Sequence, residues 1–76
     1  MTDQEREYQR RKMAQTSNEE LLSEFLIANH NVESCAIKMH EQGRTDSLLE
    51  LYDMFSNHYS LAKEEILRRM NNDRQR

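Results

Sequence analysis

Three histidines and one cysteine are the residues of this 76-residue sequence best suited to bind a metal or carry a reaction. Structural zinc sites use Cys and His at short fixed spacings, such as Cys-x-x-Cys or two histidines four residues apart on a helix. His30, His40 and His58 meet neither spacing, and Cys35 stands alone. An antiparallel fold brings His30 and His58 to one level but leaves them on different helix faces. The sequence therefore predicts no metal site.

A catalytic cysteine needs a base close enough to activate it. His40, the histidine nearest to Cys35 in sequence, is five residues away and points elsewhere on a helix. Cys35 is predicted instead to be a small buried residue, because free cysteines are often buried. Adjacent carboxylates such as Glu19 and Glu20 splay to different helix faces, and the sequence has no glycine-rich phosphate loop. We therefore expect no catalytic residue, no cofactor and no enzyme activity.

Two apolar stripes with heptad spacing flank the only glycine, Gly43. If the chain reverses there, the stripes match layer by layer and form the core seam of an antiparallel helical hairpin. Phe25 is then level with Ala62, and Ala36 with Tyr52. The seam residues are Leu22, Phe25, Asn29, Val32, Ala36 and Met39, followed by Leu48, Tyr52, Phe55, Tyr59, Ala62 and Ile66.

Capping signals give the expected element boundaries. Ser17 and Glu20 have the spacing of a capping box, so a helix should begin at the next residue after Ser17. Gly43 should end it in a left-handed conformation, and Thr45 or Ser47 should cap the following helix. The expected units are a polar N-terminal arm, frayed helix or short helix over 1–16, a hairpin over 17–71 with helices at about 18–41 and 46–71, and a loose tail over 72–76.

An all-α class follows from the absence of proline and of alternating strand patterns. Apolar residues beside the seam, at Leu21, Ala28, Cys35, Leu49, Leu51 and Met70, make the apolar surface wider than a two-stranded zipper needs. We therefore expect the hairpin to self-associate into a helical bundle and so bury the surplus. The competing arrangement is a monomer that packs its third face on Tyr8 and Met13.

Charge is distributed unevenly along the chain. Residues 16–62 hold two bases and eight acids, whereas the other nine bases lie near the two ends. The hairpin brings these ends together, so the sequence predicts a basic pole at Arg6, Arg10, Arg11, Lys12, Arg68, Arg69, Arg74 and Arg76. Such a pole suits an acidic protein surface or nucleic-acid phosphates. The overall charge of −3 favours the protein partner.

Candidate partner contacts come from this pole and from two isoleucines. Ile27 and Ile37 lie off the seam on an otherwise polar face, where an apolar side chain is available for binding. The candidates are Arg10, Arg11, Lys12, Ile27, Ile37, Arg68 and Arg69. No apolar leader or membrane segment opens the sequence, so we expect a cytoplasmic location without membrane association.

Two short phrases resemble a known group of proteins. The first is Ser17-Asn18-Glu19-Glu20-Leu21-Leu22 with Glu24-Phe25, and the second is Glu65-Ile66-Leu67-Arg68-Arg69. Together they resemble the Sda-like helical-hairpin proteins of low-GC Gram-positive bacteria and their phages, a group whose best-known member inhibits a sporulation histidine kinase. The resemblance implies a small bacterial or phage protein that binds and modulates a larger one.

The expected function is therefore a non-enzymatic protein–protein interaction module, a bacterial or phage regulator or inhibitor that binds a larger protein. The alternative is a DNA-binding accessory factor that presents the basic pole. Salt dependence discriminates the two, because phosphate contacts release counterions and weaken steeply as salt rises.

Overall fold

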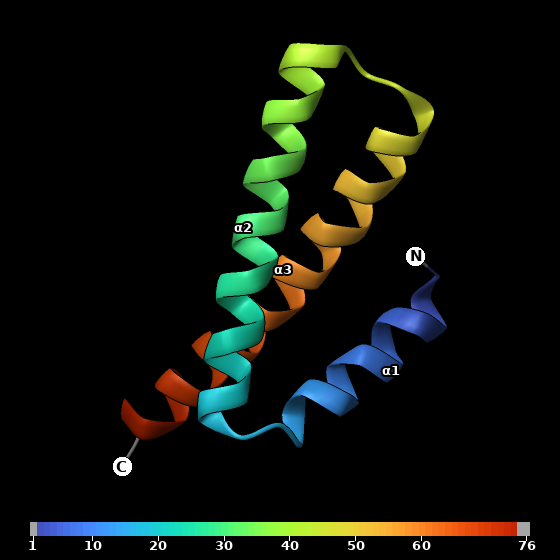
Figure 1. Ribbon diagram of the computed structural model, residues 1–76. Helices are drawn as coiled ribbons and strands as arrows, with labels where there is room; N and C mark the ends of the chain where they lie inside the picture. Colours follow the sequence, from blue (N-terminus) through green and yellow to red (C-terminus); the bar gives the residue numbers. More distant parts are fainter. Residues whose placement is uncertain (1, 75–76) are drawn as a thin grey trace.

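The computed structural model describes residues 2–74 as three α-helices without a strand in that range (Figure 1). Helix α1 spans Asp3–Ala14, α2 spans Asn18–Gln42 and α3 spans Asp46–Arg74. The all-α class is confirmed. The expected two-helix hairpin is corrected to a three-helix arrangement, because residues 3–14 form a helix that packs on the other two.

Each helix begins at a hydroxyl side chain that caps its first turn. The oxygens of Thr2, Ser17 and Thr45 each accept a hydrogen bond of 3.2 Å from the backbone N–H three residues on. These bonds satisfy amides that have no partner inside the helix. Of the two expected caps for α3, Thr45 is therefore the one used, and Ser47 lies within the helix.

Gly43 ends α2 in a conformation that favours glycine. Its φ is 88° and its ψ is 171°, and its N–H donates to the Met39 carbonyl at 3.0 Å. The positive φ agrees with the prediction, but the ψ is extended rather than left-handed helical. The extended ψ leads the chain away from the axis of α2, so that three residues suffice to reach α3.

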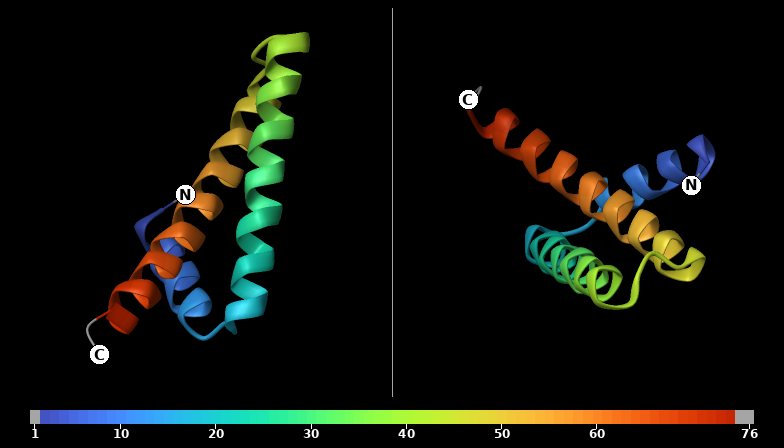
Figure 2. Two further views of the ribbon diagram at one scale, coloured as in Figure 1. Left: turned by 90° about the vertical axis from the view of Figure 1, so that its left-hand side faces the viewer. Right: turned by 90° about the horizontal axis from the view of Figure 1, so that it is seen from above.

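Helices α2 and α3 run antiparallel, and α3 lies between α2 and α1 (Figure 2). The buried apolar cluster sits where all three helices meet, and it consists of Met13, Leu21, Leu61 and Ala62, with Phe25 and Ile66 packed against it. Met13 is only 2% exposed, so α1 is docked by an apolar anchor. The packing of α1 through Met13 is therefore confirmed, whereas Tyr8 is 64% exposed.

The core seam differs from the predicted one on α2. Leu21, Ala28 and Cys35, expected beside the seam, are the buried residues of this helix. Leu22 is 54% exposed, and Ala36 and Tyr52 are exposed as well, which corrects their assignment to the core. Small side chains at positions 28 and 35 let α3 approach that stripe closely, so α2 is rotated toward it.

The other predicted seam residues lie in the interface between α2 and α3. Ala62 is buried, and the rest are half-buried, namely Phe25, Asn29, Val32, Met39, Leu48, Phe55, Tyr59 and Ile66. Their register differs from the expected one. Phe25 stacks on Tyr59 with ring centroids 5.0 Å apart, and the Cys35 thiol donates to the Leu48 carbonyl at 3.5 Å. In both pairings the residue of α3 that faces α2 lies about one helical turn along the chain from the residue that the sequence predicts at that level.

The ends of the chain also differ from expectation. Of the alternatives for residues 1–16, the structure has a helix, because Met13 and polar contacts to α3 hold α1 in place. The tail expected over 72–76 begins later, since α3 continues through residue 74. Residues 75–76 lie outside the described range.

Candidate interaction surfaces

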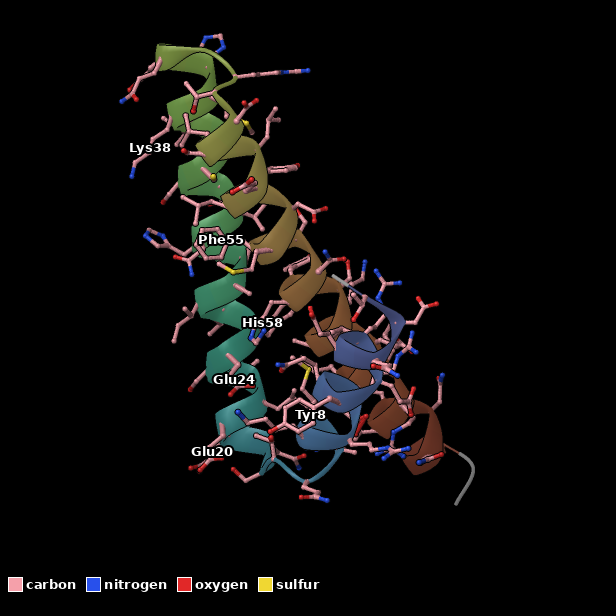
Figure 3. The ribbon with its side chains drawn as sticks, turned by 90° about the vertical axis from the view of Figure 1, so that its right-hand side faces the viewer. Tyr8, Glu20, Glu24, Lys38, Phe55 and His58 are labelled. Atoms are coloured by element: carbon pink, nitrogen blue, oxygen red, sulfur yellow. The ribbon has the colours of Figure 1, made fainter. Side chains whose placement is uncertain are left out.

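The described histidines and the cysteine do not cluster into a metal site. The described residues contain no group of three or more His, Cys, Asp and Glu placed to hold a metal ion. Cys35 is buried, as predicted. His30 Nε2 lies 3.5 Å from Ser34 Oγ one turn further along α2. His58 lies on α3, three residues after Phe55 (Figure 3).

One face of the α2–α3 pair carries two rows of exposed or half-buried residues at heptad spacing, and we call it the open face. On α2 the row is Leu22, Leu26, Asn29, Glu33, Ala36 and His40. On α3 the row is Leu49, Tyr52, Ser56, Tyr59, Lys63, Ile66 and Met70. Spacings of three and four residues place each row on one side of its helix.

Two hollows show that both rows lie on the same side of the helix pair. The hollow near the turn is lined by Ala36, Met39, His40, Arg44, Leu49 and Tyr52. The hollow at the opposite end is lined by Asn18, Leu21, Leu22, Ile66, Arg69 and Met70. Between them lies the stacked pair of Phe25 and Tyr59. The open face therefore runs along most of the α2–α3 interface.

Helix α1 packs on a different face of α3. The Arg6 guanidinium donates to Asn57 Oδ1 at 3.1 Å, and Arg10 Nε lies 3.5 Å from Glu64 Oε1. Asn57 and Glu64 each follow a residue of the open-face row, so they point about 100° away from it. The open face is therefore left uncovered by α1.

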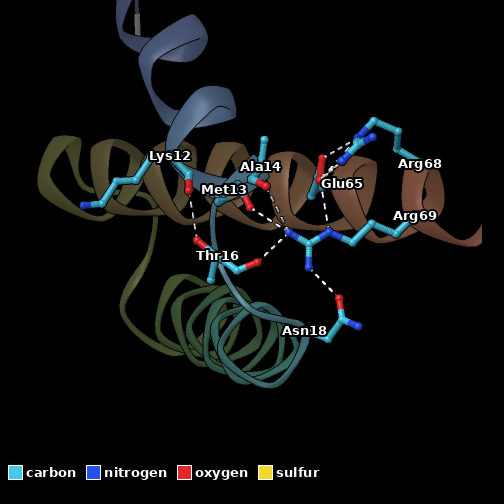
Figure 4. A network of polar contacts seen from close by, with 8 residues as sticks. All are labelled: Lys12, Met13, Ala14, Thr16, Asn18, Glu65, Arg68 and Arg69. Carbon is cyan, nitrogen blue, oxygen red and sulfur yellow. Dashed lines mark hydrogen bonds and ion pairs between the residues drawn. The ribbon is translucent and has the colours of Figure 1, made fainter.

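Arg69 joins the three helices at the end opposite the Gly43 turn (Figure 4). Its guanidinium donates to the Met13 carbonyl at 3.0 Å and to the Thr16 carbonyl at 2.6 Å. It also donates to Asn18 Oδ1 at 2.6 Å, at the first turn of α2. Carbonyls at a helix C-terminus have no partner inside the helix, so a cation there satisfies them. Arg69 was predicted to contact a partner, but its donors are used within the chain.

Glu65 holds Arg69 in place from one turn away on α3. Its Oε1 accepts from Arg69 Nε at 3.1 Å, and its Oε2 accepts from Arg68 Nε at 2.8 Å. The hydrogen bond from Arg68 lowers the pKa of Glu65 most; burial opposes this effect, and the Arg69 bond adds to the lowering. The same carboxylate raises the pKa of Arg68.

The remaining predicted basic contacts share their surface with acids. Arg10, Arg11 and Arg68 line one groove together with Glu7, Glu64 and Glu65. Arg10 and Arg11 each lie 3.7 Å from Glu7. The structure thus brings part of the predicted basic pole together, but the groove holds as many carboxylates as guanidinium groups. Arg76 lies outside the described residues.

The other candidate contacts remain exposed. Lys12 is exposed, and its backbone carbonyl accepts from Thr16 Oγ1 at 2.9 Å. Ile27 and Ile37 are 61% and 58% exposed on α2. Neither isoleucine belongs to the open-face row, and their spacing of ten residues places them about 80° apart around α2.

No protein-family model, curated protein or solved structure matches this chain. Within the described range, none of the helices combines the length and apolarity needed to cross a membrane.

Proposed function

We propose that this chain is a non-enzymatic protein-interaction module that uses the open face to bind a larger protein. It acts as a small regulator or inhibitor of the bacterial or phage kind, and it also self-associates. The observation that carries the proposal is the uncovered apolar surface of α2 and α3. Leu22 is 54% exposed and Leu26 is 56% exposed on that face. Extended exposed apolar surface of this kind is a property of protein-binding sites.

The shape of the open face suits a helical partner. Two antiparallel helices with heptad rows leave a shallow groove between them, and an amphipathic helix fills such a groove with residues at matching spacing. Tyr52 and Tyr59 lie in the groove region and supply rigid aromatic area, which is enriched at protein interfaces.

The basic pole gives less support to nucleic-acid binding. Phosphate binding needs cations that are not already neutralised. Arg69 is bound by four backbone or side-chain oxygens besides Glu65, and Arg68 and Arg10 lie against carboxylates. The arginines of this end therefore stabilise the fold, and nucleic-acid binding becomes an outcome that the experiment below must exclude.

Site-specific photo-crosslinking tests the proposal with a matched pair of neighbouring residues. A photoreactive phenylalanine analogue is placed at Leu26, on the open face, or at Ile27, which is similarly exposed but off that face. We expect irradiation of cells that make the protein to give a discrete heterologous protein adduct from position 26 only. The identified protein, once purified, should bind the unmodified chain and lose binding to Leu26→Asp but not to Ile27→Asp. Adducts from position 27 alone, or binding only to nucleic acid that falls steeply with salt, would contradict the proposal.

A further inference from the structure

The exposed area of this chain leaves room for one more interface. The accessible surface is 6113 Å² for a mass of 9.2 kDa. A compact folded monomer of this mass exposes about 4,900 Å², so the excess is about 1,200 Å². A stable protein interface of ordinary size buries about 800 Å² on each partner. This excess belongs to the whole chain, and the open face contributes to it through the exposed side chains of Leu22, Leu26, Leu49, Tyr52 and Met70.

The charges on the open face are few and opposite. Its two rows contain one acid, Glu33 on α2, and one fixed base, Lys63 on α3. Both side chains are exposed, and neither forms an ion pair with another described residue. The stacked Phe25 and Tyr59 give a common level on the two helices. Glu33 lies on the side of that level nearer the turn, and Lys63 lies on the other side, roughly 18 Å away along the axis at 1.5 Å per residue.

We infer that the open face binds a second copy of this chain about a two-fold axis that lies in the face, midway between Glu33 and Lys63. This inference rests on the open face of the proposed function and names one occupant for it. A two-fold axis at that point exchanges the two positions, so each Glu33 meets Lys63 of the other copy. Because Glu33 and Lys63 lie on different helices, this axis runs obliquely to both, so the two α2–α3 pairs pack face to face with crossed helices and cover Leu22, Leu26 and Tyr52.

A different orientation is disfavoured by the same two charges. If the axis ran parallel to the helices, Glu33 would lie against the other copy near Leu49 and Tyr52, and Lys63 would lie near Leu22. Each charge would then be covered without a partner, which costs more free energy than a paired arrangement. The axis midway between Glu33 and Lys63 is therefore favoured, because it pairs each charge with an opposite charge of the other copy.

Charge reversal tests the inference by sedimentation equilibrium. We expect the wild-type chain to dimerise, and Glu33→Lys or Lys63→Glu to raise the dimer dissociation constant about tenfold or more, because each dimer loses two attractive pairs and gains two repulsive ones. The double variant should return to within about threefold of wild type. Matched reversals away from the open face, Glu41→Lys and Lys38→Glu, should leave the constant unchanged.

Circular dichroism must show the same helix content in all variants, so that a change in association is not a change in folding. A wild-type chain that stays monomeric to millimolar concentration would overturn the inference while leaving the photo-crosslinking test of the larger partner intact. A double variant that is weaker than both single variants would overturn the proposed axis. Conversely, a confirmed dimer without any adduct from position 26 to another protein would sustain this inference and contradict the proposed function.

Discussion

Arg69 shows how one side chain connects elements that are far apart in the sequence. It reaches the end of α1, the connection at Thr16 and the start of α2 from the last part of α3. Its side chain is 21% exposed, so these hydrogen bonds are largely protected from water. Charge-assisted bonds of this kind are stronger than neutral ones. The position of α1 therefore depends on Arg69 as well as on Met13.

Replacing Arg69 should destabilise the fold measurably. We expect Arg69→Ala to lower the free energy of unfolding by about 2–3 kcal/mol, because carbonyl groups of α1 lose a charged donor. Urea unfolding followed by circular dichroism measures the change. The neighbouring Arg68→Ala is the matched control and should cost less, since Arg68 bonds only to Glu65 among these groups and is more exposed. Equal losses in the two variants would contradict the role given to Arg69.

Glu65 should make stability depend on pH in the acidic range. Its pKa is lowered in the folded state from the ordinary value of 4.5, mainly by Arg68. Below that value the unfolded chain binds a proton that the folded chain does not, so stability is fully present above pH 4.5 and falls as the pH passes through the lower folded pKa. The stability advantage of wild type over Glu65→Gln should therefore shrink below pH 4.5 in urea titrations. The same comparison with Glu64→Gln should change little, because that carboxylate is exposed.

At the scale of the elements, the turn between α2 and α3 depends on one backbone conformation. A Cβ added at Gly43 would meet no atom within 4 Å, so any cost of substitution comes from the φ of 88° itself. We expect Gly43→Ala to lower the free energy of unfolding by about 1–3 kcal/mol, whereas Gln42→Ala should be nearly neutral. A synthetic chain with D-alanine at position 43 should recover the loss, because D-residues favour positive φ. Equal stability of the L- and D-alanine chains would contradict this account.

The starts of α2 and α3 and the turn between them were predictable from the sequence because they depend on local chemistry. Ser17 and Thr45 cap these helices with hydrogen bonds that span three residues, and Gly43 adopts a conformation that other residues avoid. Composition alone indicated the all-α class. These features need no knowledge of distant contacts.

The rotation of α2 and the role of Arg69 were not predictable in the same way. Leu21 and Leu22 are neighbours with the same side chain, and only the approach of α3 and Met13 decides which one is buried. Arg69 of α3 reaches the α1 carbonyls only once α1 has docked. A polar segment with few apolar residues gave little signal for that docking, although a single well-placed methionine was sufficient.

At the scale of the whole molecule, the three helices form an elongated body of 48 × 24 × 18 Å, with exposed apolar side chains along the open face. The polar contacts at the basic pole hold the helices together. We therefore propose that stability and recognition depend on different surfaces of α3.

A dilution series followed by amide NMR tests this division most directly. Chemical shifts recorded from micromolar to millimolar concentration locate the surface that changes its environment, without any substitution. We predict concentration-dependent shifts along the open-face rows of α2 and α3, with the amides of α1 unchanged. Shifts confined to α1 and the groove of Arg10 and Arg68 would contradict the central claim that the open face is the interaction surface, and no shift at any position would contradict self-association through that face.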